Sequence, residues 1–373
     1  MNLTILIVGL GGLGSVLLEL LARSSLSCRL IVGSRNRLHG TACCNLAKLG
    51  AQAQGYDPDI DFIHLDLDEP KATIKTIQSI SPDIIVCTAT RQSWWLPRQL
   101  PAPRASRFKS AGFGLWLPLH LSLPTALMRI LHSADYRGFT LIAPFPDVVN
   151  CILNRIGLSP TCGIGNVDEI ATKVRGLAAA KLRAPIDEVT VTLVGHHALE
   201  KCAFDGSPEA VPYFLRVDHN GRDVTKEVKA PELLMEPFSL PEGPPTHFLT
   251  AGSAVRLITA LGSDRSVRLH APGPNGLPGG YPVLASMSGV TVPEIDGLSL
   301  SDAIHINEQS HQFDGIERIE EDGTVIFTEN VVTTARDELG FNCSRLEPHE
   351  VETRAQELLS KFQAYAKGFG MVF

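Results

Sequence analysis

The sequence predicts an α/β protein in which a doubly wound parallel sheet is followed by an α+β domain. Three observations support this prediction: apolar β-branched segments recur near the N-terminus, a glycine-rich turn follows the first of them, and helical patterns separate them. The chain has 373 residues, and because a single core stops growing near ~250 residues, we expect more than one domain. The expected domains cover 1–147 and 148–315, with an extension over 316–373.

The composition is that of an ordinary globular protein. The chain is 44% hydrophobic and 20% charged, which excludes extensive disorder, collagen and coiled coil. Its net charge of -7 and its lack of a basic run argue against nucleic acid as a partner. We expect no membrane association and no metal, since the sequence has neither a membrane-spanning apolar stretch nor a metal-spaced cluster. Eight cysteines without a CxxC pair favour a reducing, cytoplasmic location.

The first apolar segment, residues 3–8, leads directly into the sequence Gly-Leu-Gly-Gly-Leu-Gly at 9–14. In this GxGxxG pattern the first glycine allows a tight turn, the second lets the backbone approach a pyrophosphate, and the third lets the next helix pack on the strand. The helix N-terminus then presents its backbone N–H groups and its dipole to the anion. We therefore expect a Rossmann domain that binds a dinucleotide through Gly9, Gly11, Gly12, Leu13 and Gly14.

The second strand, residues 29–33, ends where enzymes that use NAD usually carry an acidic residue for the ribose 2′-hydroxyl. Here the sequence continues Ser34-Arg35-Asn36-Arg37 and offers no carboxylate. An arginine beside a hydroxyl suits a 2′-phosphate, because a planar guanidinium pairs with phosphate bidentately. We therefore expect Ser34 and Arg35 to bind the cofactor, and NADP(H) to be preferred over NAD(H). In the alternative interpretation, Arg35 and Arg37 are solvated loop charges.

Two further strands, at 62–68 and 83–90, continue the expected sheet. The later strand ends in the small residues Thr88 and Ala89, where a cofactor lies across the carboxyl ends of parallel strands. A loop rich in proline, tryptophan and arginine follows, and its arginines are Arg91, Arg98, Arg104 and Arg107. We expect this loop to close over an anionic substrate. The alternative is a stiff surface connection.

The order of the motifs from residue 83 onward resembles the lactate/malate dehydrogenase superfamily. The similar stretches are 88–92, 141–149, 162–168, 190–197, 250–254 and 280–283, and the resemblance spans about residues 1–315. It implies hydride transfer between a nicotinamide and a carbonyl or carbinol carbon, with His197 as acid/base and Asp168 holding its ring. It further implies that Arg91 is a catalytic residue on a mobile loop, that Thr250 lines the substrate pocket, and that the protein forms a homodimer or homotetramer.

Hydride transfer at a carbonyl needs a proton carrier, since the oxygen gains or loses a proton as the carbon gains or loses hydride. An imidazole that titrates near neutrality serves both directions, and a carboxylate on its second nitrogen fixes the tautomer. His196 competes with His197 for this role, because neighbouring residues on a strand point to opposite faces. Asp168 has an alternative role as the N-cap of a helix.

The sequence departs from the family at positions that would hold the substrate. The family has an arginine soon after the catalytic aspartate, whereas the first arginine here is Arg175, and Pro144 replaces the family's asparagine. We therefore expect a substrate other than lactate or malate. Its carboxylate would be bound by Lys173 or Arg175, or by loop arginines such as Arg91, Arg98 and Arg104.

The leading prediction is an NADP(H)-preferring oxidoreductase for a 2-oxo acid, a 2-hydroxy acid or a related carbonyl compound, with a small anionic substrate. One alternative is an NADPH-dependent imine or amino-acid dehydrogenase that resembles the saccharopine and opine reductases. The Asp-Leu-Asp strand end at 66–68 and the missing arginine favour that alternative. Another is a nucleotide-sensing protein that keeps the cofactor fold without catalysis.

Residues 316–373 extend beyond the resemblance. Two alternating runs joined by Glu-Glu-Asp-Gly at 320–323 predict a hairpin, and a helix with an apolar stripe is expected from near Pro348. We expect this extension to pack on the second domain.

Overall fold

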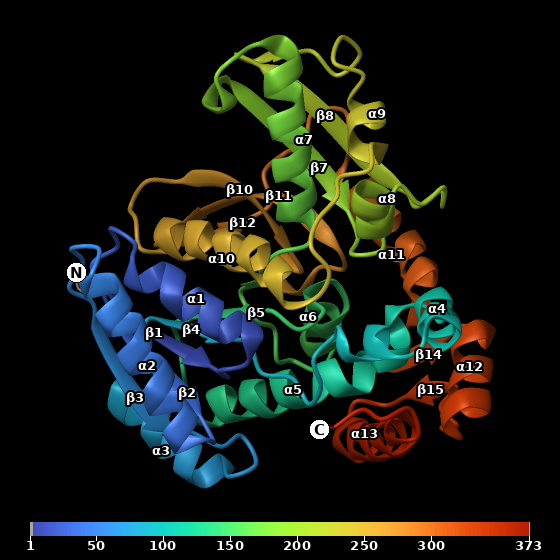
Figure 1. The fold of residues 1–373 in the computed structure, drawn as a ribbon. Helices are drawn as coiled ribbons and strands as arrows, with labels where there is room; N and C mark the ends of the chain where they lie inside the picture. Colours follow the sequence, from blue (N-terminus) through green and yellow to red (C-terminus); the bar gives the residue numbers. More distant parts are fainter. Residues whose placement is uncertain (1–2, 373) are drawn as a thin grey trace.

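The computed structural model, which describes residues 3–372, begins with a six-stranded parallel sheet (Figure 1). Its strands are β1 (Leu3–Val8), β2 (Cys28–Ser34), β3 (Asp59–His64), β4 (Ile84–Cys87), β5 (Phe139–Ile142) and β6 (Cys162–Gly163). They stand in the order β3-β2-β1-β4-β5-β6. The order reverses between β1 and β4, and at such a switch point the carboxyl ends of the strands flank a ligand crevice. The predicted doubly wound sheet is confirmed.

Helices cover both faces of this sheet because its strands are apolar on both sides. Alternate residues of β1 point to opposite faces: Ile5 and Ile7 join one core, and Leu6 and Val8 join the other. The first core receives α1 (Gly12–Ala22), α2 (Arg37–Gln52) and α10 (His247–Leu261). The second receives α3 (Pro70–Ile80), α5 (Leu117–Ser133) and α6 (Pro146–Arg155).

The second part of the chain is built on an antiparallel sheet with the order β10-β11-β7-β8-β9, and β12 pairs with β11. Its strands are β7 (Val189–Gly195), β8 (Tyr213–His219), β9 (Arg222–Asp223), β10 (Val267–Pro272), β11 (Gly280–Ser286) and β12 (Gly289–Thr291). The helices of this part are α7 (Val167–Leu182), α8 (Leu199–Asp205), α9 (Ala230–Met235) and α11 (Leu300–Ser310). This mixed architecture confirms the predicted α+β character.

The C-terminal extension contains the predicted hairpin, formed by β13 (Ile316–Ile319) and β14 (Val325–Phe327), to which β15 (Arg345–Leu346) adds a third strand. Helix α12 (Glu329–Leu339) and helix α13 (Val351–Lys367) complete it. No helix among residues 3–372 is both long and apolar enough to cross a membrane.

The extension packs on the first domain as well as on the second, where it was expected. Helix α13 lies against α5, and α12 lies against α4 (Ala102–Ala111), both in the first domain (Figure 1). In the second domain, Arg155 donates to the backbone carbonyl of Ile319. Phe362 meets Trp116 with ring centroids 5.1 Å apart, and Tyr365 meets Phe108 at 5.8 Å. The physical reason is that α5 is apolar around most of its circumference, so its outer face needs a cover that the sheet cannot supply.

Candidate functional site

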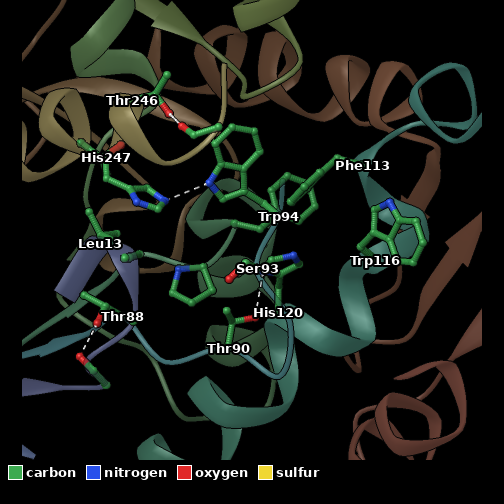
Figure 2. A pocket seen from close by; sticks show the side chains of 18 of the residues that line it. Leu13, Thr88, Thr90, Ser93, Trp94, Phe113, Trp116, His120, Thr246 and His247 are labelled. Carbon is green, nitrogen blue, oxygen red and sulfur yellow. Dashed lines mark hydrogen bonds between the residues drawn. The ribbon is translucent and has the colours of Figure 1, made fainter. Parts of the chain in front are cut away.

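A cavity of about 990 Å³ runs from the glycine turn after β1 to His197 at the end of β7. Thr88 and Ala89 line it beyond the end of β4, and Thr250 of α10 lines it from the second domain. Figure 2 shows Leu13, Thr88, Trp94 and His120 around this space. The cavity therefore joins the predicted dinucleotide site to the predicted acid/base.

The glycine turn has the shape that its sequence predicts. Gly9 has φ of +99°, a conformation that L side chains rarely adopt. A Cβ at Gly14 would lie 2.2 Å from the Gly9 carbonyl oxygen, so only glycine allows α1 to start this close to β1. Thr88 donates its hydroxyl to the same carbonyl at 2.8 Å and closes the turn against β4. Gly9, Gly11, Gly12 and Leu13 line the cavity.

Ser34, the last residue of β2, and Arg35, which follows it, both line the cavity. The Arg35 side chain is 65% exposed, and its Nη1 lies 3.8 Å from Oδ2 of Asp68. That carboxylate is engaged more closely by Arg91 at 2.6 Å. Arg35 is thus available to a phosphate at this end of the cavity.

His197 stands at the far end of the cavity with its ring fixed on three sides. Its Nδ1 lies 2.8 Å from Oδ2 of Asp314, and its backbone N–H donates to Oδ1 of Asp147 at 2.9 Å. The rings of Phe113 and Phe145 flank the imidazole, each with a centroid separation of 5.0 Å. Since Nδ1 is used by Asp314, Nε2 is the nitrogen left for a substrate.

The electrostatics of this pair favour the imidazolium. Burial alone would lower the pKa of His197, but the charge and hydrogen bond of Asp314 outweigh burial and raise that pKa to about 9. Burial alone would raise the pKa of Asp314, and the neighbouring His197 and His196 hold it well below its ordinary value instead. At neutral pH the pair is therefore an ion pair with a proton available on Nε2.

The predicted pairing of Asp168 with His197 is wrong, because Asp314 takes that place. Asp168 is buried, pairs with Nη1 of Arg256 at 3.4 Å and accepts the backbone N–H of His270 at 3.3 Å. The reason is helical geometry: α7 begins at Val167, so successive residues of its first turn point about 100° apart. Asp168 faces α10 and β10, whereas Glu169 faces the cavity.

The side chains of the adjacent residues His196 and His197 have different surroundings. His197 lines the cavity, whereas the side chain of His196 is fully buried and accepts the backbone N–H of Ala198 at Nδ1. The same Nδ1 lies 3.3 Å from Oδ2 of Asp314, so the His196 ring packs beside the carboxylate that binds His197. The alternation of side chains at a strand end predicts that one of the two points inward, but not which one.

Three of the cationic residues predicted to hold the substrate are occupied elsewhere. Arg91 is only 12% exposed and pairs with Asp68 at 2.6 Å and Glu352 at 2.9 Å, which ties the loop to α13. Arg175 donates to the backbone carbonyls of Ile186 and Val189, and buried Lys173 donates to the carbonyl of Leu234 at 3.0 Å. These residues hold secondary structure elements together and lie outside the cavity lining.

Of the other loop arginines, two form ion pairs with the extension and one lines the cavity. Arg104 and Arg107 both pair with Glu338 of α12 at 2.9 Å, so they fasten the extension to α4. Arg98 lines the cavity, with its guanidinium carbon 4.7 Å from the centroid of the Trp94 ring. Of the arginines predicted to bind the substrate, all of which lie in the described part of the chain, only Arg98 lines the cavity.

Two carboxylates that sequence reasoning missed face the cavity near His197. Thr250, a predicted pocket residue, donates its hydroxyl to Oε1 of Glu169 at 2.7 Å, and Oε2 of Glu200 lies 3.9 Å from Nε2 of His197. Burial raises the pKa of Glu169 to about 8, with a further contribution from the charge of Glu200. Burial likewise raises the pKa of Glu200. The position of Glu200, one helical turn after His197, was the signal that could have revealed it.

Comparison with solved structures places this fold among the malate and lactate dehydrogenases. Malate dehydrogenase from Plasmodium falciparum superposes with a TM-score of 0.57 over 97% of this chain and 99% of that one, at 14% identity. The minor L-lactate dehydrogenase from Enterococcus mundtii gives 0.58 over 83% and 96%, also at 14% identity. Lactate dehydrogenase from Eimeria maxima, with NADH and oxamate, gives 0.56 over 84% and 92%, at 12% identity.

No protein-family model and no curated protein sequence matches this chain. The predicted resemblance is confirmed at the level of the fold, which is a divergent form of the malate and lactate dehydrogenase fold.

Proposed function

We propose that this protein is an NADP(H)-preferring oxidoreductase that interconverts a carbonyl compound and its alcohol, with His197 as the acid/base. The observation that carries the proposal is the position of the His197–Asp314 pair in the same cavity as the glycine turn. Solved structures with this fold include dehydrogenases with NADH bound, which supports a nicotinamide cofactor.

The residues of the glycine turn and those at the end of β2 fit a dinucleotide. Gly9, Gly11 and Gly12 line the cavity at the start of α1, Gly11 has open space where a side chain would stand, and Ser34 and Arg35 would hold the ribose end. When bound, the nicotinamide supplies or accepts the hydride. The protein would contribute position and a dry environment, since Phe113 and Phe145 shield His197 from solvent.

His197 would donate the proton at Nε2 to the carbonyl oxygen during reduction and take it back during oxidation. The carboxylate of Asp314 fixes the ring orientation and stabilises the imidazolium, and the buried position of Asp314 keeps it free of competing solvent. Asp147 holds the backbone of His197 and so fixes where Nε2 points.

Arg98 is the proposed anchor for an anionic group such as a 2-oxo acid carboxylate. We expect Arg98→Met to raise KM for such a substrate by roughly tenfold or more, because a charged hydrogen bond is lost, with a smaller change in kcat. Arg175→Met is the matched control and should leave KM unchanged, since its guanidinium binds backbone carbonyls outside the cavity. Steady-state kinetics of both variants decide this, and equal KM values in Arg98→Met and wild type would remove Arg98 from the site.

The proposed NADP(H) preference depends on Arg35. We expect Arg35→Ala to weaken NADPH binding by roughly tenfold or more and to leave NADH binding nearly unchanged, because only NADPH carries the 2′-phosphate. Fluorescence titration with both cofactors measures this. Arg37→Ala is the control, since Arg37 is exposed and does not line the cavity. Equal losses for NADPH and NADH would contradict the assignment.

A second candidate function is reduction of an imine formed from a carbonyl compound and an amine. Glu169 and Glu200 favour it, because two acidic side chains beside the acid/base would accept hydrogen bonds from the nitrogen of such a substrate, and a bound cationic nitrogen would stabilise their charged forms against burial. NADPH oxidation assayed with a panel of 2-oxo acids and other carbonyl compounds, with and without amines, tests both candidates. Turnover without amine supports the first, turnover only with amine supports the second, and tight NADPH binding without turnover would support a sensor.

A further inference from the structure

His247, the first residue of α10, is a buried histidine in the cavity wall that no part of the proposed mechanism uses. His247 is 7% exposed, and its Nε2 accepts a hydrogen bond from the indole N–H of Trp94 at 3.3 Å (Figure 2). The two rings meet edge to face with centroids 6.3 Å apart. The contact thus joins α10 to the loop that carries Arg98.

This hydrogen bond decides where the proton of His247 lies. The indole N–H is only a donor, so Nε2 must present its lone pair, and a neutral imidazole then carries its proton on Nδ1. Burial lowers the pKa of His247, which favours the neutral ring. Within residues 3–372 no group hydrogen-bonds to the buried Nδ1. The tertiary structure therefore holds a buried N–H donor without an acceptor, which is unfavourable unless a ligand supplies one.

The unpaired donor lies against the first turn of α1. A Cβ at Gly12 would be 2.7 Å from Nδ1 of His247 and 2.6 Å from Cε1, so a side chain at position 12 would overlap the ring. Helix α1 is 11 residues long, and its N-terminal backbone N–H groups attract an anion. Nδ1 of His247, on a helix 235 positions later in the chain (247 against 12), therefore lies beside the first turn of α1 and its backbone N–H groups.

We propose that His247 is a ligand of the dinucleotide pyrophosphate, and that its bond to Trp94 positions the substrate loop when the phosphates are bound. The proposal rests on the dinucleotide cofactor of the proposed function. A phosphate oxygen that accepts from Nδ1–H fixes the tautomer in which Nε2 accepts from Trp94, so the two hydrogen bonds reinforce each other. Arg98 stacks on the same indole at 4.7 Å, and the order of contacts runs from phosphate through His247 and Trp94 to Arg98.

Binding of two fragments tests the contact without relying on turnover. 2′-Phospho-ADP-ribose contains the pyrophosphate, whereas adenosine 2′-monophosphate shares its 2′-phosphate but lacks the pyrophosphate. In His247→Phe we expect calorimetry to show the affinity for the first fragment reduced by roughly tenfold or more, and the affinity for the second unchanged. His120→Phe is the matched control, a buried cavity histidine that contacts Thr90 and Phe113 rather than Gly12, and should bind both fragments as wild type does.

The indole N–H resonance of Trp94 provides a second readout that does not depend on the stability of His247→Phe. In wild-type protein labelled with ¹⁵N we expect this resonance to shift on addition of 2′-phospho-ADP-ribose and not of adenosine 2′-monophosphate. Trp94→Phe keeps an aromatic side chain but removes the indole N–H donor. We expect this variant to bind the first fragment more weakly by roughly two- to fivefold, since the His247 tautomer is no longer fixed.

Several outcomes would overturn the inference. Wild-type affinity of His247→Phe for 2′-phospho-ADP-ribose would exclude the contact, and equal losses for the two fragments would indicate a merely structural histidine. A Trp94 resonance that does not respond to the first fragment would exclude the link to the loop. If wild-type protein binds neither fragment, the proposed cofactor itself is wrong, which is a different failure from binding that is independent of His247.

Discussion

Replacing His197 with glutamine should reduce kcat for carbonyl reduction by about 10²- to 10⁴-fold, the usual contribution of a positioned general acid. The amide side chain can still occupy the space between Phe113 and Phe145, but it has no proton to transfer. Cofactor affinity should change little, because the glycine turn and Arg35 lie at the other end of the cavity. A large loss in kcat with preserved NADPH binding is therefore the expected pattern.

The measurement combines single-turnover kinetics with a fluorescence titration of NADPH. His219→Gln is a suitable control, since His219 lies on β8, pairs with Glu188 at 3.0 Å and is outside the cavity lining. If His197→Gln reduced the substrate as fast as wild type, His197 would have no acid/base role, and Glu169 or Glu200 would be the groups to examine next.

Asp314→Asn should have the second large effect, a loss in kcat of about 10²- to 10⁴-fold together with a changed pH profile. In wild type, reduction requires protonated His197, so kcat/KM should be constant at neutral pH and fall as the pH rises through about 9. Without the Asp314 carboxylate, burial is opposed only by the charges of Glu200 and Asp147, so the pKa of His197 falls from its value in the wild type. The fall in activity should therefore begin at a lower pH in the variant.

The control for Asp314→Asn is Asp168→Asn, the carboxylate that sequence reasoning assigned to His197. Its ion pair with Arg256 holds α7 to α10, so the variant should be less stable to heat yet keep the wild-type pH profile. A profile that shifts in Asp168→Asn and stays fixed in Asp314→Asn would reverse our assignment of the two residues.

The first domain was predictable because its signals are local. A strand, a glycine turn and a helix follow one another within residues 3–22, and Gly9 and Gly14 have the steric reasons that the pattern predicts. The strand ends at Thr88 and Ala89 were found for the same reason, since the carboxyl ends of parallel strands meet at one edge. In this domain the local sequence pattern therefore predicts the elements that the tertiary structure contains.

The partners of the charged groups were not predictable in this way. Asp314 reaches His197 across 117 positions of sequence, and Arg91 reaches Glu352 across 261, so no spacing pattern links either pair. The errors over Asp168 and Arg175 arose within α7, where a shift of one residue turns a side chain by about 100° and moves it from the cavity to a helix contact. Burial then determines which carboxylates stay charged, and burial is a property of the assembled domains.

By itself, the sequence determined a doubly wound sheet with a glycine cradle, a cationic residue instead of an acidic one after β2, and a histidine pair at the end of a later strand. Only the tertiary structure decided that His197 rather than His196 enters the cavity, that Asp314 holds it, and that Arg98 lines the cavity whereas Arg91 and Arg175 do not. The physical reason is that backbone conformation follows from neighbouring residues, whereas the pairing of buried charges depends on which distant elements share one core.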